Sequence, residues 1–288
     1  MKKLLALSLA LLLLTGCAAT YDGPTVEKPV LSEYTSQHYS SFFGSTDMLY
    51  STRATYAYDI YGNMVRTQVY RDGELESVTN LRYDDRGNRI CQTTWDHTGW
   101  IPLISRREKR TYDDQNRLLT TVYYNGWGRE TDRSVYTYDD ETGIRTYQDE
   151  TGAIRQTTWY DENGLELRQT ADEYETIYEY DDRGNCTGWV SYRSGILSDS
   201  YKARYDDQNR LIWDARFDAS GSLKSESEYT YDDEAHTMTH RRPNGQVRCE
   251  HYLPDGRLSR IEDYNTEGVI ALVQKYTYRD IQVPVKEE

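Results

Sequence analysis

Phenylalanine, basic residues and long apolar runs are all scarce in this chain. Only 3 Phe accompany 28 Tyr, which suits sheets with one wet face, because a tyrosine buries its ring and keeps its hydroxyl hydrated. Lysine and arginine number 34 against 48 acidic residues, so the net charge is −14. That charge repels nucleic acid and anionic lipid surfaces and leaves neutral polysaccharides, cations and basic proteins open as partners.

Signatures of catalysis and metal binding are equally sparse. Serine occurs without a nucleophile-elbow motif, and no glycine-rich loop between a strand and a helix is present to hold phosphate. His236 and His240 lie four residues apart, which is about 13 Å on a strand and too far for one metal ion, although His240 could meet His251 across a hairpin. The sequence therefore predicts no enzyme, no metal and no cofactor.

The first seventeen residues predict export and lipidation. Lys2 and Lys3 precede an apolar run over 4–14 that is too short for a stable membrane span and typical of a signal peptide, here 1–16. The run ends in a sequence that resembles the lipobox of bacterial lipoproteins, in which a cysteine thiol receives diacylglycerol. By that resemblance the mature chain begins at Cys17 and is anchored to a bacterial membrane on its extracytoplasmic side. The preceding lipobox residues are Leu14, Thr15 and Gly16.

Three regions follow the signal peptide. Residues 17–47 begin with the lipidated cysteine, show no sustained period and contain Pro24 and Pro29, so we expect a flexible tether that spans roughly 30 Å. Residues 48–282 are predicted to form short strands separated by turns. Residues 283–288 are expected to be a C-terminal tail.

A Tyr-Asp dipeptide followed by turn residues recurs through the long region. The steps between successive tyrosines are 25, 29, 26, 22, 20, 25 and 26 residues, a period that predicts an array of similar supersecondary units. A second turn signal lies between successive copies, so each period is one strand, turn, strand, turn unit. The tyrosines of the motif are Tyr58, Tyr83, Tyr112, Tyr138, Tyr160, Tyr180, Tyr205 and Tyr231.

Alternation of side chains supports strands throughout this region. Leu211, Trp213 and Ala215 share one face by period two, and Tyr229 and Tyr231 also lie two apart. Aromatic ladders should therefore cross one side of the sheet. Pairing in sequence order predicts an all-β fold, an elongated and twisted antiparallel meander of hairpins.

Two copies of the repeat carry a fuller motif and resemble the Rhs/YD-repeat family. Its units combine Tyr-Asp, two variable residues, Gly, and then Asn or Arg. The resemblance covers roughly 55–280 and implies stacked β-hairpins, as in the shells that large family members build around a secreted toxin. No toxin-like domain follows here, and Asn116 and Asn209 replace the glycine in two copies. The best matches are Tyr83, Asp84, Gly87 and Asn88, and Tyr180, Asp181, Gly184 and Asn185.

Paired aspartates follow most of the repeat tyrosines. Neighbouring residues on a strand point to opposite faces, so the two carboxylates of a pair such as Asp84 and Asp85 should not converge for acid/base work. Calcium would need more oxygen ligands than one pair supplies. Capping of the turn backbone is the favoured role, with weak cation binding and acid/base chemistry as alternatives.

Cysteines and tryptophans complete the candidate residues. Lipidation of Cys17 would leave Cys91, Cys186 and Cys249, an odd number, and we expect free thiols at the first two because they lie about eight predicted strands apart. Six tryptophans allow an aromatic binding surface, although strand packing is the alternative. The ligand-facing candidates are Trp100, Trp127 and Trp189.

These observations predict a membrane-anchored envelope lipoprotein whose non-enzymatic β-hairpin scaffold serves binding or spacing. One alternative is a module that binds cell-wall polysaccharide through exposed Trp and Tyr side chains. The other alternative is a hydrolase or metal-dependent enzyme. Besides the membrane that holds the lipid, the expected partners are a neutral glycan or a basic protein, and nucleic acid is not expected.

Overall fold

The computed structural model describes residues 24–40 and 47–285. The signal peptide, Cys17 and the lipobox lie outside these residues. All regular elements in the described part are strands, and the twenty strands are β1 Thr25–Tyr39, β2 Met48–Tyr58, β3 Met64–Arg71, β4 Glu74–Tyr83, β5 Arg89–Asp96, β6 Leu103–Tyr112, β7 Leu118–Tyr124, β8 Glu130–Asp139, β9 Ile144–Gln148, β10 Ile154–Tyr160, β11 Glu166–Ala171, β12 Tyr174–Tyr180, β13 Cys186–Arg193, β14 Ile196–Tyr205, β15 Leu211–Asp218, β16 Leu223–Asp232, β17 Thr237–Arg241, β18 Val247–Tyr252, β19 Leu258–Tyr264 and β20 Ile270–Pro284.

Alternation along the strands sorts side chains onto two faces, as the sequence indicated. In β16 exposed and half-buried residues alternate along most of the strand, with Tyr229 and Tyr231 half-buried and Glu226 and Glu228 exposed. Cross-strand aromatic pairs occur on the tyrosine side: Tyr136 stacks on Tyr147 with ring centroids 5.5 Å apart. We call the face that carries Tyr229 and Tyr231, with its counterparts on other strands, the tyrosine face, and the other the opposite face.

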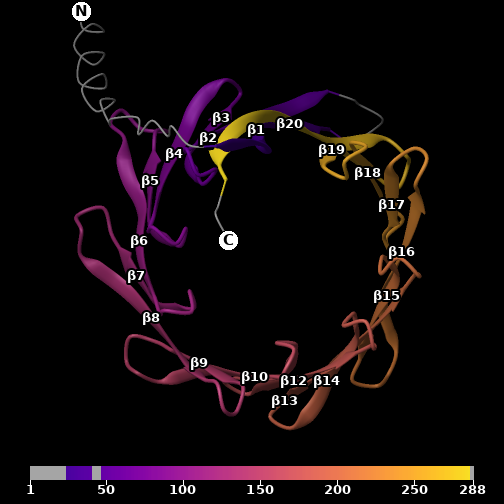
Figure 1. The fold of residues 1–288 in the computed structure, drawn as a ribbon. Coiled ribbons are helices and arrows are strands. Elements are labelled where there is room, and N and C mark those ends of the chain that lie inside the picture. The colour runs from indigo at the N-terminus through magenta and orange to yellow at the C-terminus, as the bar shows by residue number, and fades with distance from the viewer. Residues whose placement is uncertain (1–23, 41–46, 286–288) are drawn as a thin grey trace, which may run out of the picture.

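The sheet closes on itself into a twenty-stranded antiparallel β-barrel. Each strand pairs with its neighbours in sequence, and β1 pairs with both β2 and β20. Viewed end-on, the strands form a ring in which indigo β1 and yellow β20 lie side by side (Figure 1). The expected elongated meander is therefore wrong, because β1 pairs with both the first and the last strand of the hairpin series, β2 and β20.

The closing strand β1 comes from the segment expected to be a tether. Thirteen residue pairs join β1 to β20 and seven join it to β2. The proline within it, Pro29, is tolerated opposite Asp280, and Val30 beside it is buried. At the other end of the chain, β20 extends to Pro284, into the predicted tail. The repeat-free sequence of 25–39 thus supplies the pairing partner that both edges of the array need.

The barrel has two rims that differ in their turns. Because neighbouring strands are antiparallel, all turns that follow even-numbered strands lie at one rim, and these include the Tyr-Asp turns; we call it the YD rim. The turns that follow odd-numbered strands lie at the other rim, which we call the distal rim. β1 begins and β20 ends at the YD rim, where Val285 donates a backbone hydrogen bond to Pro24 at 3.0 Å.

Deletion of residues 25–39 tests the role of β1. The deletion leaves β2 and β20 with unpaired edges, and exposed edges associate with other chains. We expect a protein that self-associates in a concentration-dependent manner and unfolds at lower temperature, measured by light scattering and thermal unfolding. Deletion of residues 286–288, which lie beyond the last described strand, is the control. A monomeric deletion protein with unchanged unfolding temperature would contradict closure by β1.

Candidate functional site

The Tyr-Asp motif builds the same tight turn in most of its copies. The Asp84 amide donates to the Asn88 carbonyl at 2.9 Å, and the Gly87 amide donates to the Asp84 carbonyl at 3.0 Å. The Asp84 carboxylate in turn accepts hydrogen bonds from the backbone amides of Arg86 at 3.0 Å and Asn88 at 2.8 Å. Asp181 holds its turn in the same way. The first aspartate of each pair therefore shapes the backbone.

The fourth residue of the turn, counted from the motif aspartate, needs a left-handed backbone conformation. Gly87 and Gly184 adopt φ of 85° and 82° there. Asn116 and Asn209 occupy the same position with φ of 65° and 62°. Asparagine is the non-glycine residue that tolerates this region best, because its short polar side chain can bond locally. The two departures from the glycine pattern thus keep the turn.

In seven of its eight copies, the tyrosine of the motif ties its hairpin to the strand or hairpin before it. The Tyr83 hydroxyl donates to the Met64 carbonyl at 2.9 Å, and burial raises the pKa of Tyr83. Sequence reasoning expected a hydrated hydroxyl and missed this bond, which depends on the neighbouring hairpin. The same bond recurs from Tyr58, Tyr112, Tyr138, Tyr180, Tyr205, Tyr231 and Tyr278 to the carbonyls of Leu31, Arg89, Leu118, Glu166, Cys186, Leu211 and Leu258.

Some of the second aspartates have a partner, and that partner lies in the neighbouring turn. Asp233 accepts from Arg210 at 2.6 Å, and Asp140 pairs with Arg117 in the same way. Asp85 makes no hydrogen bond or ion pair with any part of the chain that the structure describes. A pair whose second aspartate has a partner therefore divides its carboxylates between its own turn and the next, and the two do not converge on one ligand.

Exposed tryptophans gather at the distal rim. Trp100 lies in the loop between β5 and β6 and is 105% exposed, and Trp127 lies in the turn between β7 and β8 and is 94% exposed. A Cβ added at Gly126 would lie 3.1 Å from the Ile104 carbonyl, so the second turn leans against the start of β6. We call these two indoles, with exposed Ile101 beside Trp100, the tryptophan rim.

Trp189, the third candidate, lies in a different environment. It is half-buried in β13 and stacks on Tyr201 of β14 with ring centroids 5.7 Å apart. The Arg216 guanidinium lies 5.8 Å from its ring centroid. The structure thus places Trp100 and Trp127 in two successive turns of the distal rim, and Trp189 within a strand of the barrel.

Histidines and cysteines do not assemble a site in the described residues. The register pairs His240 with Arg248 and His251 with Thr237, so the two imidazoles do not face each other. His240 stacks on Tyr229 at 4.4 Å, and burial lowers its pKa. No group of three or more His, Cys, Asp or Glu within residues 24–40 and 47–285 could hold a metal ion. The thiols of Cys91, Cys186 and Cys249 are free.

No helix in the described part of the chain is long and apolar enough to cross a membrane.

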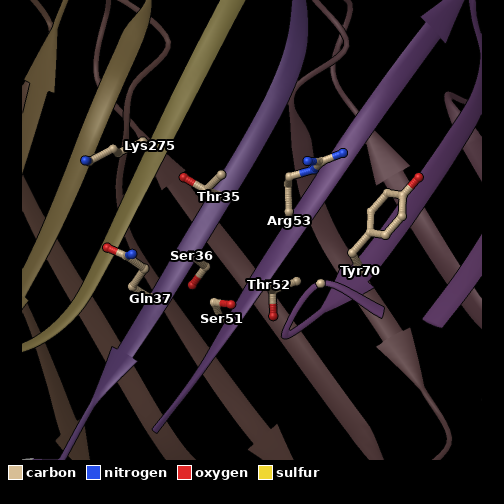
Figure 2. A pocket seen from close by; sticks show the side chains of 9 residues that line it. Thr35, Ser36, Gln37, Ser51, Thr52, Arg53, Tyr70 and Lys275 are labelled. Atoms are coloured by element: carbon tan, nitrogen blue, oxygen red, sulfur yellow. The ribbon is translucent and has the colours of Figure 1, made fainter. Parts of the chain in front are cut away.

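A cavity of about 350 Å³ opens where β1, β2, β3 and β20 meet. Figure 2 shows Lys275 on the β20 side and Arg53 with Tyr70 on the other side, with Thr35 between them on β1. The Arg53 guanidinium carbon lies 4.8 Å from the Tyr70 ring centroid. Sequence reasoning missed this cavity because β1 was assigned to the tether.

Comparisons with known proteins identify no family. No protein-family model matches the chain, and no curated protein matches it. A porin-like protein from Bacteroides uniformis is similar with a TM-score of 0.37 and 12% identity, over 89% of this chain and 99% of that chain. A porin-like protein from Bacteroides vulgatus follows with a TM-score of 0.25 and 14% identity, over 70% and 94% of the two chains. Similarities this low carry no argument about function.

The resemblance to the Rhs/YD-repeat family is accordingly wrong as a guide to this chain. The family implied an open array of stacked hairpins, whereas β1 joins both ends of the series into a barrel. Tyr-Asp turns reflect local turn chemistry that serves either arrangement, so they do not discriminate between the two.

Adjacent aspartates provide a matched pair of variants. Asp84→Ala removes the acceptor for two backbone amides, whereas Asp85→Ala removes a carboxylate with no described partner. We expect Asp84→Ala to lower the unfolding temperature by a few degrees, about 2–4 °C, and Asp85→Ala to leave it nearly unchanged. Calorimetry measures both. Equal shifts in the two variants would exclude the capping role.

Proposed function

We propose that this protein is a lipid-anchored scaffold of the bacterial envelope whose barrel stands in water and presents the tryptophan rim to a neutral wall glycan. The observation that carries the proposal is the full exposure of Trp100 and Trp127 in two nearby turns of one rim. Large exposed apolar side chains that cluster mark interaction sites more often than isolated ones do. An indole offers a flat apolar face with a polar edge, which suits the carbon face of a sugar ring.

Charged side chains on both faces of the barrel sheet support a barrel that lies in water and not in a bilayer. On the tyrosine face, Glu108 is fully buried and accepts from Arg89 and Arg106 at 2.8 Å, with Arg110 at 3.0 Å. Its neighbour Lys109 lies on the opposite face and is exposed. A barrel embedded in a bilayer turns an apolar band about 25 Å tall to lipid, and a Lys or Arg at mid-membrane costs about 2–4 kcal/mol. Either face of this sheet would carry such a cost.

The position of the two rims fits an anchor at Cys17. The described chain begins at Pro24, at the YD rim, and Pro24 is the seventh residue after Cys17. That segment reaches at most about 25 Å when fully extended. An anchor there holds the YD rim near the lipid. The distal rim with its tryptophans then points away from that membrane and toward the cell wall.

The Cys17→Ser variant tests two things together: the lipid anchor, and the location of the barrel in water outside the bilayer. Without lipid, a barrel with charged faces should leave the membrane fraction and appear as a soluble protein, because acyl chains supply the membrane affinity. Membrane fractionation of cells that express either form is the measurement. Unchanged membrane retention of Cys17→Ser would contradict the assignment of Cys17 as the lipid anchor.

Binding to cell wall tests the tryptophan rim. The soluble Cys17→Ser protein should sediment with isolated cell wall, and the Trp100→Ala/Trp127→Ala double variant should lose most of that binding. Tyr61→Ala, which removes an aromatic ring that is 62% exposed at the YD rim, is the matched control. Stacking on a neutral sugar should change little with salt, whereas a basic protein partner should be released as screening increases. Wall binding that survives the double variant would overturn the role of the rim.

A further inference from the structure

We infer that the seam where β1 closes the barrel is a binding site for an acidic saccharide, a hydroxylated ligand that carries one carboxylate or phosphate group. The seam site is distinct from the tryptophan rim. It consists of the 350 Å³ cavity and an adjoining cavity of about 320 Å³, which share Gln37 and Lys275. The combined size lies in the usual range for small-molecule sites.

Register places a row of cations on one face across the seam. Thr35 of β1 pairs with Arg53 on one side and with Lys275 on the other, and Lys275 pairs with Arg260 of β19. Directly paired residues share a face with Cβ atoms about 5 Å apart. Tyr70 continues the row beyond Arg53. Three cations therefore lie within four neighbouring strands of a chain whose net charge is −14.

The charges in this row are unequally compensated. Arg260 forms an ion pair with Glu262, and the Arg53 guanidinium lies 3.7 Å from Glu33. Lys275 forms no ion pair with any residue in the described ranges, and no aspartate or glutamate lines either cavity. The Lys275 ammonium, on the wall that the cavities share, is thus the group available to an anion.

Neutral polar groups surround this ammonium. The Thr35 and Ser51 hydroxyls and the Gln37 amide lie on the face that carries Lys275 and line the first cavity (Figure 2). The Ser51 hydroxyl also donates to the Asp72 carboxylate at 3.3 Å. The Tyr70 ring bounds the far side. Hydroxyls and amides both donate and accept, so they match the hydroxyls of a sugar, while the ammonium makes a charge-assisted bond to its acidic group. The chemistry of the lining therefore selects an acidic saccharide over a neutral one.

The site exists only in the closed barrel. β1 supplies Thr35 and Gln37, β2 supplies Arg53, and β20 supplies Lys275, so residues near both ends of the chain form one lining. A ligand that binds the closed state and not the open one stabilises closure in proportion to its occupancy. Ligand binding at the seam should therefore raise the unfolding temperature.

Titration of the full-length Cys17→Ser protein with glucuronate, glucose 1-phosphate and glucose tests the seam site. We expect at least one of the two anions to bind, to raise the unfolding temperature, and to bind at least about tenfold more tightly than glucose. The first two ligands distinguish a carboxylate from a phosphate as the anionic group. Equal affinity for glucose and both anions, or no binding of either anion, would overturn the proposal.

Variants at the seam have matched controls. Lys275→Ala should weaken binding of the anion at least about tenfold, and Lys275→Arg should retain most of it because the charge remains. Lys202→Ala, which removes an exposed ammonium from β14 elsewhere in the wall, should bind as the parent does. The Trp100→Ala/Trp127→Ala protein should also bind normally, so failure of the rim and failure of the seam are separate results. Unchanged affinity in Lys275→Ala would exclude the site.

Discussion

Every strand in a sheet needs a partner on both sides, and the whole molecule depends on how β1 meets that need. A series of hairpins leaves one unpaired edge at each end, and here those edges belong to β2 and β20. β1 lies between them, with thirteen residue pairs on one side and seven on the other. Because closure removes both edges, the barrel avoids the edge-to-edge association that an open sheet of this length would invite. It also brings Pro24 and Val285, at the two ends of the described chain, to one rim.

One type of turn recurs around the barrel. Its residues account for most of the side chains that look like catalytic candidates in the sequence. An aspartate such as Asp84 caps the backbone, a glycine or asparagine provides the left-handed residue, and the tyrosine bonds to the preceding hairpin. In some copies the second aspartate reaches an arginine in the neighbouring turn, as Asp233 does with Arg210. Carboxylates that look like catalytic pairs are thus distributed as structural bonds. Fixed geometry of this kind suits a scaffold.

The two proposed binding surfaces depend on the fold in different ways. The tryptophan rim is formed by connections between strands that are neighbours in sequence, so Trp100 and Trp127 are placed by local structure. The seam, in contrast, combines Arg53 from one end of the series with Lys275 from the other. The first surface is apolar and insensitive to charge, whereas the second is a local concentration of cations in an acidic protein. A scaffold with both could hold a neutral and an acidic saccharide at separate places.

By itself, the sequence determined the local structure of this protein. Alternating side chains and turn residues such as Asp84 and Gly87 predicted strands and turns correctly, because both follow from contacts between residues close in the chain. The closure of the sheet was decided only in the tertiary structure. Residues 25–39 carry no repeat and contain Pro29, so nothing local distinguishes a closing strand from a tether, and their partners in β20 lie about 240 residues away. The seam follows from that long-range pairing. The tyrosine hydroxyl bonds and the separation of His240 from His251 depend instead on the register between neighbouring strands and hairpins, which the pattern of residue types does not specify.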